Sequence, residues 1–212
     1  MYNIAVIGAG TMGNGIAHVF AQHGFSVQLI DLNEKQLEKA MSVISKNMDR
    51  QIQKGLLSAD EKDKALLNIK PVLKLQDGTQ NADLIIEAAT ENESVKLQIF
   101  RELDELAASH AILATNTSSI SITKIASSTK RPEQVIGMHF MNPVPLMKLV
   151  EVINGYATKS EVTDKIIALT GQINKTPCVV NDYPGFVANR ILMPMINEAI
   201  ISLQEGVASV ES

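Results

Sequence analysis

The stretch Ile4-Ala5-Val6-Ile7-Gly8-Ala9-Gly10-Thr11-Met12-Gly13 lies near the start of the chain and decides the fold. Its first four residues have the length and the branched side chains of a buried strand. Gly8 allows a tight turn, Gly10 lets the backbone approach a phosphate, and Gly13 lets the next helix pack closely on the strand. A helix that begins near Thr11 points its first free amide groups at a bound anion. The stretch therefore predicts a pyrophosphate-binding turn whose contact residues are Gly8, Gly10, Thr11, Met12 and Gly13.

The residue after the second predicted strand indicates which dinucleotide would bind. That strand, residues 27–30, ends at Asp31. A carboxylate at this place accepts hydrogen bonds from the adenosine ribose and repels a 2′-phosphate. Leu32 and Asn33 follow, so no arginine is present there to receive such a phosphate. NAD is therefore favoured over NADP, with a purely structural turn and a flavin-binding version of the same unit as the alternatives.

Composition and charge exclude several other classes. The chain of 212 residues has a formal net charge of −4, which gives no indication of nucleic-acid binding. Its single cysteine, Cys178, excludes an internal disulfide, and the apolar run around it favours a buried structural thiol. Neither a signal peptide nor an apolar stretch of membrane-spanning length is apparent. We expect a cytoplasmic protein with no metal site and with no nucleic-acid or membrane partner.

Strand-like and helix-like segments alternate along the chain, which predicts an α/β, Rossmann-type fold with a mostly parallel sheet. Ligands of such sheets bind beyond the carboxyl ends of the strands. After residue 80 we expect strands at 83–87, 111–114, 135–139, 149–153 and 176–180, with helices near 94–108 and 160–174.

Residues 34–67 predict a helical arm that projects from the sheet. A helical pattern runs from Glu34 to Lys54 and ends at Gly55, and a second helix follows the capping sequence Ser58-Ala59-Asp60-Glu61. Two helices fill more of the chain than a plain crossover between strands needs. A projecting arm of this kind often holds part of a ligand.

Two polar residues at the later strands could carry proton transfer. Histidine has an unperturbed pKa of about 6.5, which makes His139 the obvious titratable group. Glu151 lies in the otherwise apolar segment Leu149–Ile153, where an unpaired charge would be costly to bury. A partner is therefore needed, and His139 is a reasonable one, because a carboxylate would fix the tautomer of the imidazole. A structural role for both residues is the alternative.

Four segments of the chain resemble the 3-hydroxyacyl-CoA dehydrogenases, and within that family most closely the bacterial enzymes that act on 3-hydroxybutyryl-CoA. The resemblance covers essentially the whole chain. The segments are Asn116-Thr117-Ser118-Ser119, Gly137-Met138-His139-Phe140-Met141-Asn142-Pro143-Val144-Pro145, Lys148-Leu149-Val150-Glu151-Val152 and Asp182-Tyr183-Pro184-Gly185-Phe186-Val187-Ala188-Asn189-Arg190.

The resemblance implies NAD-dependent oxidation of a short-chain (3S)-3-hydroxyacyl-CoA to the 3-ketoacyl-CoA, and the reverse reaction. It implies that His139 is the general base and that Glu151 holds it. Ser118 and Asn189 would form hydrogen bonds around the reacting oxygen of the substrate, with Ser118 also contacting the cofactor. The alternatives are a related dehydrogenase of a free hydroxy or sugar acid, and a non-catalytic NAD-binding module.

The remaining site residues also follow from the resemblance. Glu91, Lys96 and Asn142 match positions that contact the nicotinamide half of NAD. Asn47 and Lys54, on the predicted arm, match positions that hold the coenzyme A moiety. Without the resemblance, Lys54 would be taken for a solvated surface charge.

The resemblance further implies two domains. Residues 1–183 would form the NAD-binding domain, and residues 184–212 the start of a helical C-terminal domain that forms a homodimer in the full-length protein. A helix is expected at about 184–205, apolar nearly all round and interrupted by Pro194. Since family members continue beyond this point, we expect a fragment with impaired catalysis and dimerisation.

Overall fold

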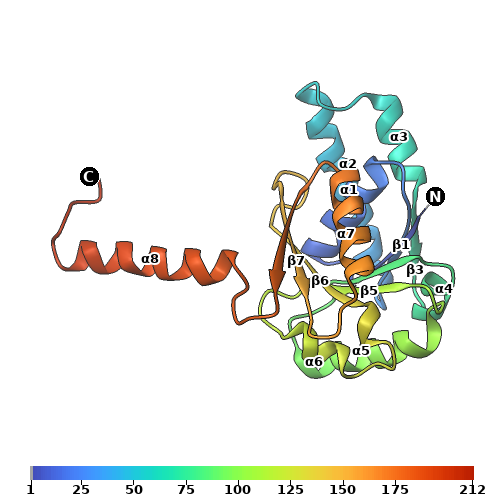
Figure 1. Cartoon of the computed structure of the whole chain (residues 1–212). Helices are drawn as coiled ribbons and strands as arrows, with labels where there is room; N and C mark the ends of the chain where they lie inside the picture. The colour runs from blue at the N-terminus through green and yellow to red at the C-terminus, as the bar shows by residue number, and fades with distance from the viewer. Residues whose placement is uncertain (1) are drawn as a thin grey trace.

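One sheet of eight strands forms the centre of the molecule in this computed structural model, which describes residues 2–212 (Figure 1). The strands are β1 (Asn3–Ile7), β2 (Ser26–Ile30), β3 (Ile69–Val72), β4 (Leu84–Glu87), β5 (Ile112–Thr115), β6 (Val135–Phe140), β7 (Leu149–Asn154) and β8 (Thr176–Asn181). Their order across the sheet is β3-β2-β1-β4-β5-β6-β7-β8. Only β6 and β7 pair in an antiparallel way among the described strands. The predicted Rossmann-type fold with a mostly parallel sheet is confirmed.

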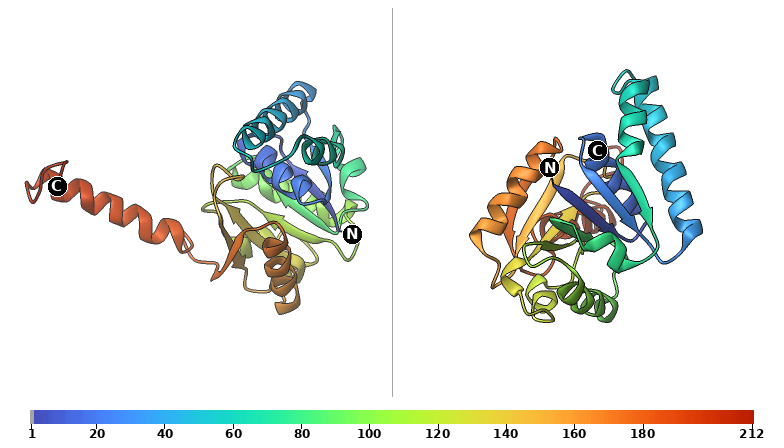
Figure 2. Two further views of the ribbon diagram at one scale, coloured as in Figure 1. Left: turned by 90° about the horizontal axis from the view of Figure 1, so that it is seen from above. Right: turned by 90° about the vertical axis from the view of Figure 1, so that its right-hand side faces the viewer.

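Helices cover both faces of this sheet (Figure 2). Because successive residues of a strand point to opposite faces, Ile4 and Val6 pack in one apolar cluster while Ala5 and Ile7 pack in the other. The first cluster lies under α1, α2, α3 and α7, and the second under α5 and α6. The helices are α1 (Thr11–Gln22), α2 (Glu34–Gln53), α3 (Ala59–Leu67), α4 (Leu75–Thr79), α5 (Glu93–Leu106), α6 (Ile122–Ala126), α7 (Ser160–Gln172) and α8 (Ala188–Gln204), with a short 3₁₀ helix at Pro132–Gln134.

The edge strand β3 was not expected from the sequence. Its residues read Ile69-Lys70-Pro71-Val72, and a proline within such a run counts against a strand. β3 pairs only with β2, so one side of its backbone needs no ladder partner. Proline is tolerated at such an edge. The helical arm therefore lies within a β2–β3 crossover.

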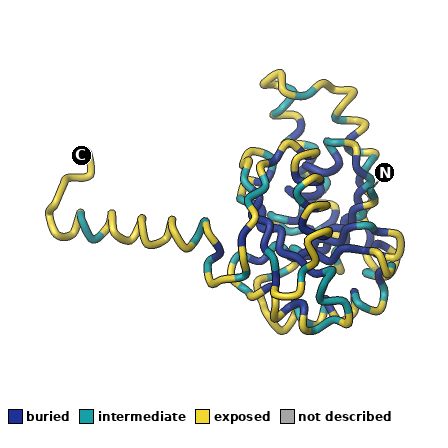
Figure 3. The backbone as a smooth tube through the Cα atoms, in the orientation of Figure 1, coloured by how far each residue is buried: buried dark blue, intermediate teal, exposed yellow. Residues whose placement is uncertain are grey.

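The arm itself has the predicted construction. Ser58 and Glu61 form the reciprocal capping box at the start of α3, and Gly55 takes the left-handed φ of +68° after α2. The first part of α2 is held on the sheet by its buried positions Leu37, Ala40 and Ile44. The far end of the arm is largely exposed (Figure 3).

The last helix differs from the prediction at its start. α8 begins at Ala188, later than the expected 184, because Gly185 and Phe186 have φ values of +79° and +49°, which no right-handed helix can include. None of the residues of α8 is buried, and many of its apolar side chains are exposed. The helix extends away from the sheet (Figure 3). None of the helices in residues 2–212 is long and apolar enough to cross a membrane.

Cys178 was expected to be a buried thiol and is only half-buried. It lies on β8, which pairs with β7 alone and is largely exposed along its length. An edge strand has fewer neighbours to cover its side chains, which is the reason for the difference.

His18, on α1, makes the stability of the fold depend on pH. Its side chain is fully buried, and only Nε2 has a partner, Gln22 Oε1 at 3.1 Å. Burial lowers the pKa of His18 from 6.5 to about 4, against a smaller opposing effect of the Gln22 hydrogen bond. In the unfolded chain His18 becomes protonated below about pH 6.5. In the folded chain it stays neutral down to about pH 4. Stability contributed by neutral His18 is present above pH 6.5 and is lost as the pH falls.

Replacement of His18 by glutamine should therefore weaken the pH dependence of unfolding. Between pH 7 and pH 5 the wild-type chain is expected to lose about 2 kcal/mol of unfolding free energy through this residue. Urea unfolding at the two pH values measures the loss in each protein. His110→Gln is the matched control because His110 is exposed. Equal losses in the His18 and His110 variants would contradict the assignment.

Candidate active site

The glycine turn has the geometry of a phosphate cradle. Gly8 has a φ of +94°, and a Cβ on it would lie 2.5 Å from the Cα of Ala89. A Cβ on Gly13 would lie 1.7 Å from the carbonyl oxygen of Gly8, so α1 could not pack as it does. A Cβ on Gly10, by contrast, would meet no atom within 4 Å. The chain thus requires the outer two glycines, while the middle one borders open space in front of the free amides of α1.

An apolar cavity of about 570 Å³ lies on one side of this turn. Asp31 stands at its edge with one carboxylate oxygen accepting from the amide of Ala9 (2.8 Å) and the other from the amide of Asn33 (3.0 Å). Each oxygen keeps a second lone pair for a ribose hydroxyl. Ile30, Leu32 and other apolar side chains form walls that suit an adenine ring. The cavity fits the adenosine half of NAD.

A smaller cavity of about 250 Å³ lies beyond the middle glycine. Gly10, Thr11 and Met12 form one side of it, and Glu91 and Lys96 lie on the other. Since the dinucleotide crosses the crevice at the turn, this cavity is on the side where the nicotinamide half belongs.

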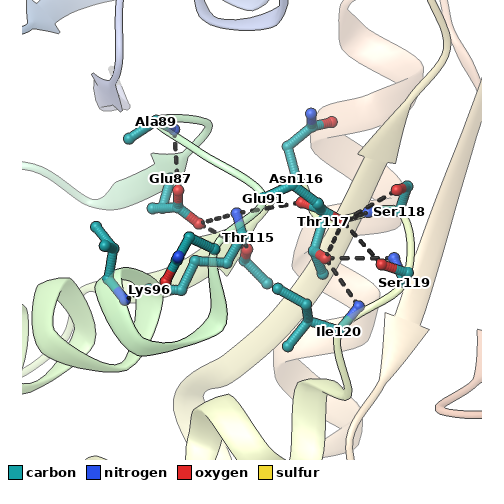
Figure 4. Close-up of polar contacts among 12 residues, drawn as sticks. Glu87, Ala89, Glu91, Lys96, Thr115, Asn116, Thr117, Ser118, Ser119 and Ile120 are labelled. Carbon is teal, nitrogen blue, oxygen red and sulfur yellow. Dashed lines mark hydrogen bonds and ion pairs between the residues drawn. The ribbon is translucent and has the colours of Figure 1, made fainter.

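A buried carboxylate, Glu87, holds Lys96 at this cavity (Figure 4). Lys96 Nζ lies 2.6 Å from Glu87 Oε2, and both side chains are almost fully buried. Thr115 donates to the same oxygen (2.8 Å), and the amide of Ala89 donates to the other (2.9 Å). Glu87 was missed in the sequence, although a carboxylate that closes an apolar strand is the same signal that singled out Glu151.

Glu91 joins the cofactor side to the loop that carries Ser118 (Figure 4). Its Oε1 accepts from the hydroxyls of Thr117 (2.8 Å), Ser118 (3.0 Å) and Ser119 (3.1 Å) and from the amide of Ser118 (2.8 Å). Partial burial by itself would raise the pKa of Glu91, but these hydrogen bonds and Lys96 outweigh it and hold the pKa below its usual range.

His139 and Glu151 lie opposite one another on the antiparallel strands β6 and β7. His139 Nδ1 is 2.8 Å from Glu151 Oε2, and both side chains are buried. The pairing that the sequence indicated is present. If Nδ1 carries the proton that this contact requires, Nε2 has the lone pair of the neutral ring and can accept a proton from a substrate.

The other oxygen of Glu151 is used by the start of α8. It accepts from the amides of Val187 (2.9 Å) and Ala188 (2.8 Å). Asn189, next in the chain, places its side-chain amide 3.5 Å from the carbonyl oxygen of Ser118. The start of α8 therefore carries both the amides that hold Glu151 and, one residue later, Asn189, which contacts Ser118; both Asn189 and Ser118 were expected around the reacting oxygen.

The structure places the remaining predicted residues on the arm side. Asn47 and Asn142 line a cavity of about 220 Å³ between α2 and the glycine turn. Lys54 ends α2, about two helical turns further out, and is exposed. Among residues 2–212, no group of three or more His, Cys, Asp or Glu side chains is placed to hold a metal ion.

A dinucleotide cradle that opens beside a buried histidine–carboxylate pair is the arrangement of an NAD-dependent alcohol-oxidising dehydrogenase. The comparison with known families specifies the class. The 3-hydroxyacyl-CoA dehydrogenase NAD binding domain matches residues 3–183, and the C-terminal domain of the same family matches residues 185–212. The chain belongs to the 3-hydroxyacyl-CoA dehydrogenase family.

Individual relatives agree with this assignment. A probable 3-hydroxybutyryl-CoA dehydrogenase of Bacillus subtilis is 47% identical over 209 residues, which are 99% of this chain and 72% of that protein. A 3-hydroxybutyryl-CoA dehydrogenase of Bradyrhizobium diazoefficiens is 49% identical, with 99% and 71% covered. The crystal structure of (S)-3-hydroxybutyryl-CoA dehydrogenase from Ralstonia eutropha superposes with a TM-score of 0.95 at 44% identity, covering 100% of this chain and 74% of that one. The predicted family, enzyme class and use of NAD are confirmed.

Proposed function

We propose that the protein oxidises a short-chain (3S)-3-hydroxyacyl-CoA, such as 3-hydroxybutyryl-CoA, to the 3-ketoacyl-CoA and catalyses the reverse reduction. The observation that carries this proposal is the buried His139–Glu151 pair beside the NAD cradle. The names of the relatives in Bacillus, Bradyrhizobium and Ralstonia support the substrate class.

Bound NAD supplies the acceptor for the hydride from C3 of the substrate. His139 Nε2 takes the proton of the 3-hydroxyl group as general base. The resulting imidazolium is stabilised by the carboxylate of Glu151, which the amides of Val187 and Ala188 hold in place. In the reduction, His139 returns the proton to the oxygen.

Ser118 and Asn189 assist at the reacting oxygen. The hydroxyl of Ser118 donates to Glu91 in the structure. Three further donors reach the same carboxylate oxygen. Glu91 therefore stays hydrogen-bonded when Ser118 rotates its hydroxyl toward the substrate oxygen, and the rotation does not leave the carboxylate without a partner.

Lys54 holds a phosphate of coenzyme A, with Asn47 contacting the same ligand nearer the sheet. A long arm that carries a cation at its far end suits an acyl-CoA better than a small free hydroxy acid. This feature separates the proposal from the related dehydrogenases of free acids.

Consumption of NADH with acetoacetyl-CoA, at enzyme concentrations above that of the substrate so that slow turnover is seen, tests the proposal. We expect oxidation of NADH and binding of coenzyme A that weakens about 5-fold in Lys54→Ala, the size of one exposed charge pair. Lys165→Ala is the matched control, since Lys165 is exposed near the amino ends of β4 and β5. Oxidation that also proceeds with free acetoacetate, or coenzyme A binding that ignores Lys54, would favour the free-acid alternative.

We further propose that the full-length protein acts in the cytoplasm as a homodimer. Exposed apolar side chains on α8, among them Ile191, Met195 and Ile200, provide a surface that association would cover. Sedimentation of the full-length protein as a monomer in a concentrated sample would contradict this.

A further inference from the structure

We propose that the charged cluster of Glu91 and Lys96, which line the smaller cavity, and Glu87 behind them raises the affinity for NAD⁺ relative to NADH above that of a neutral site. The inference goes beyond the proposed reaction and rests on the use of NAD at this site. It concerns the relative affinity of the site for the two forms of one cofactor.

The glycine turn is the reference point that locates the cluster relative to a bound dinucleotide. Asp31 and the large apolar cavity lie on one side of the turn, and the smaller cavity with Glu91 and Lys96 lies on the other. A dinucleotide whose pyrophosphate met Gly10 would place its second riboside on the side of the smaller cavity. The redox-active ring would then be on the same side of the turn as the cluster.

The charges of the cluster sum to one negative unit. Glu87 and Lys96 lie 2.6 Å apart with side chains 0% and 1% exposed, so they compensate each other. Lys96 also forms a longer ion pair with Glu91, at 3.8 Å, so one cation faces two carboxylates. Every donor within hydrogen-bonding distance of Glu91 Oε1 is a neutral hydroxyl or amide.

Glu91 is ionised at neutral pH, because the hydrogen bonds to its carboxylate favour the charged form. The other residues that line this cavity carry no charged side chain. The amino end of α1 adds a positive partial charge, but this end faces the phosphates, which are the same in both forms of the cofactor.

The two forms differ in charge at the ring alone. The nicotinamide of NAD⁺ carries one positive charge, and that of NADH is neutral. A negative unit beside the ring stabilises NAD⁺ and leaves NADH nearly unaffected. Contacts to ribose, phosphates and adenine change both affinities together and cancel in their ratio.

Glu91→Gln tests this inference, because glutamine keeps the shape and the acceptor oxygen but removes the charge. Calorimetric titration gives the dissociation constants of NAD⁺ and NADH in the absence of substrate. The ratio of the NAD⁺ constant to the NADH constant is expected to rise about 5-fold in the variant, the order expected for one charge at a half-exposed site. Glu91→Asp keeps the charge and shortens the side chain, so it should retain the wild-type ratio even where both affinities fall.

Glu102→Gln is the matched control, since Glu102 lines the adenosine cavity. The same neutralisation there should leave the ratio unchanged. A ratio that is equal in wild type and Glu91→Gln, or a ratio that moves as much in Glu102→Gln, would overturn the inference while leaving NAD binding intact. Failure to bind either form would overturn the inference together with the assigned cofactor.

Discussion

His139→Ala should lower kcat for acetoacetyl-CoA reduction by about 10²- to 10⁴-fold, the usual contribution of general acid–base catalysis. The imidazole of His139 is the group placed to exchange a proton with the substrate oxygen, and alanine has no side-chain group that can do so. NADH binding should stay within about 2-fold of wild type, because the cofactor turn does not contact this side chain. Stopped-flow NADH absorbance and calorimetry measure the two quantities.

His110→Ala is the control for this substitution. His110 is exposed, pairs with Asp83 at 3.1 Å and lies near the amino ends of the strands, away from the cofactor. Its replacement should leave kcat unchanged. Equal turnover by wild type and His139→Ala would show that the proton moves through another group, and no turnover by either would favour the non-catalytic module.

Gly13→Ala should abolish measurable NAD binding and destabilise the fold by about 1–3 kcal/mol. The added Cβ would lie 1.7 Å from the carbonyl oxygen of Gly8, so α1 must move away from the turn. The amides that meet the pyrophosphate move with it. Thermal unfolding and calorimetric titration with NAD⁺ report the two effects.

Two further glycines separate packing from binding. Gly171→Ala, on α7 with nothing within 4 Å of the new Cβ, should be neutral or slightly stabilising. Gly10→Ala, also without a protein neighbour within 4 Å, should fold normally and still weaken NAD binding. If Gly10→Ala binds NAD as wild type does, the phosphates do not lie against this turn.

The sequence predicted the parts of the fold that depend on local patterns. The glycine turn, the capping box at Ser58 and the alternation of strands and helices are properties of short segments. β3 was missed because it contains Pro71, and proline is tolerated in a strand only at the edge of a sheet. A local sequence pattern does not show that a strand will lie at an edge. The start of α8 was wrong because the left-handed backbone of Phe186 is not visible in its residue type.

The site shows the same division. Glu151 interrupts an apolar strand, which indicated that its charge needs a partner. That partner, His139, lies on the neighbouring strand. Glu87 gave the same signal but was not used. The four donors on Glu91 come from residues far along the chain, and their convergence follows from the order β4–β5 in the sheet, which the sequence did not specify.

Glu151 is hydrogen-bonded to the base on one side and to the first amides of α8 on the other. Protonation of His139 and the position of the C-terminal segment are therefore coupled through the hydrogen bonds of one carboxylate. By thermodynamic linkage the influence is reciprocal. A ligand that draws α8 closer alters the proton affinity of the base, and each turnover, by charging and discharging His139, alters how firmly the segment is held.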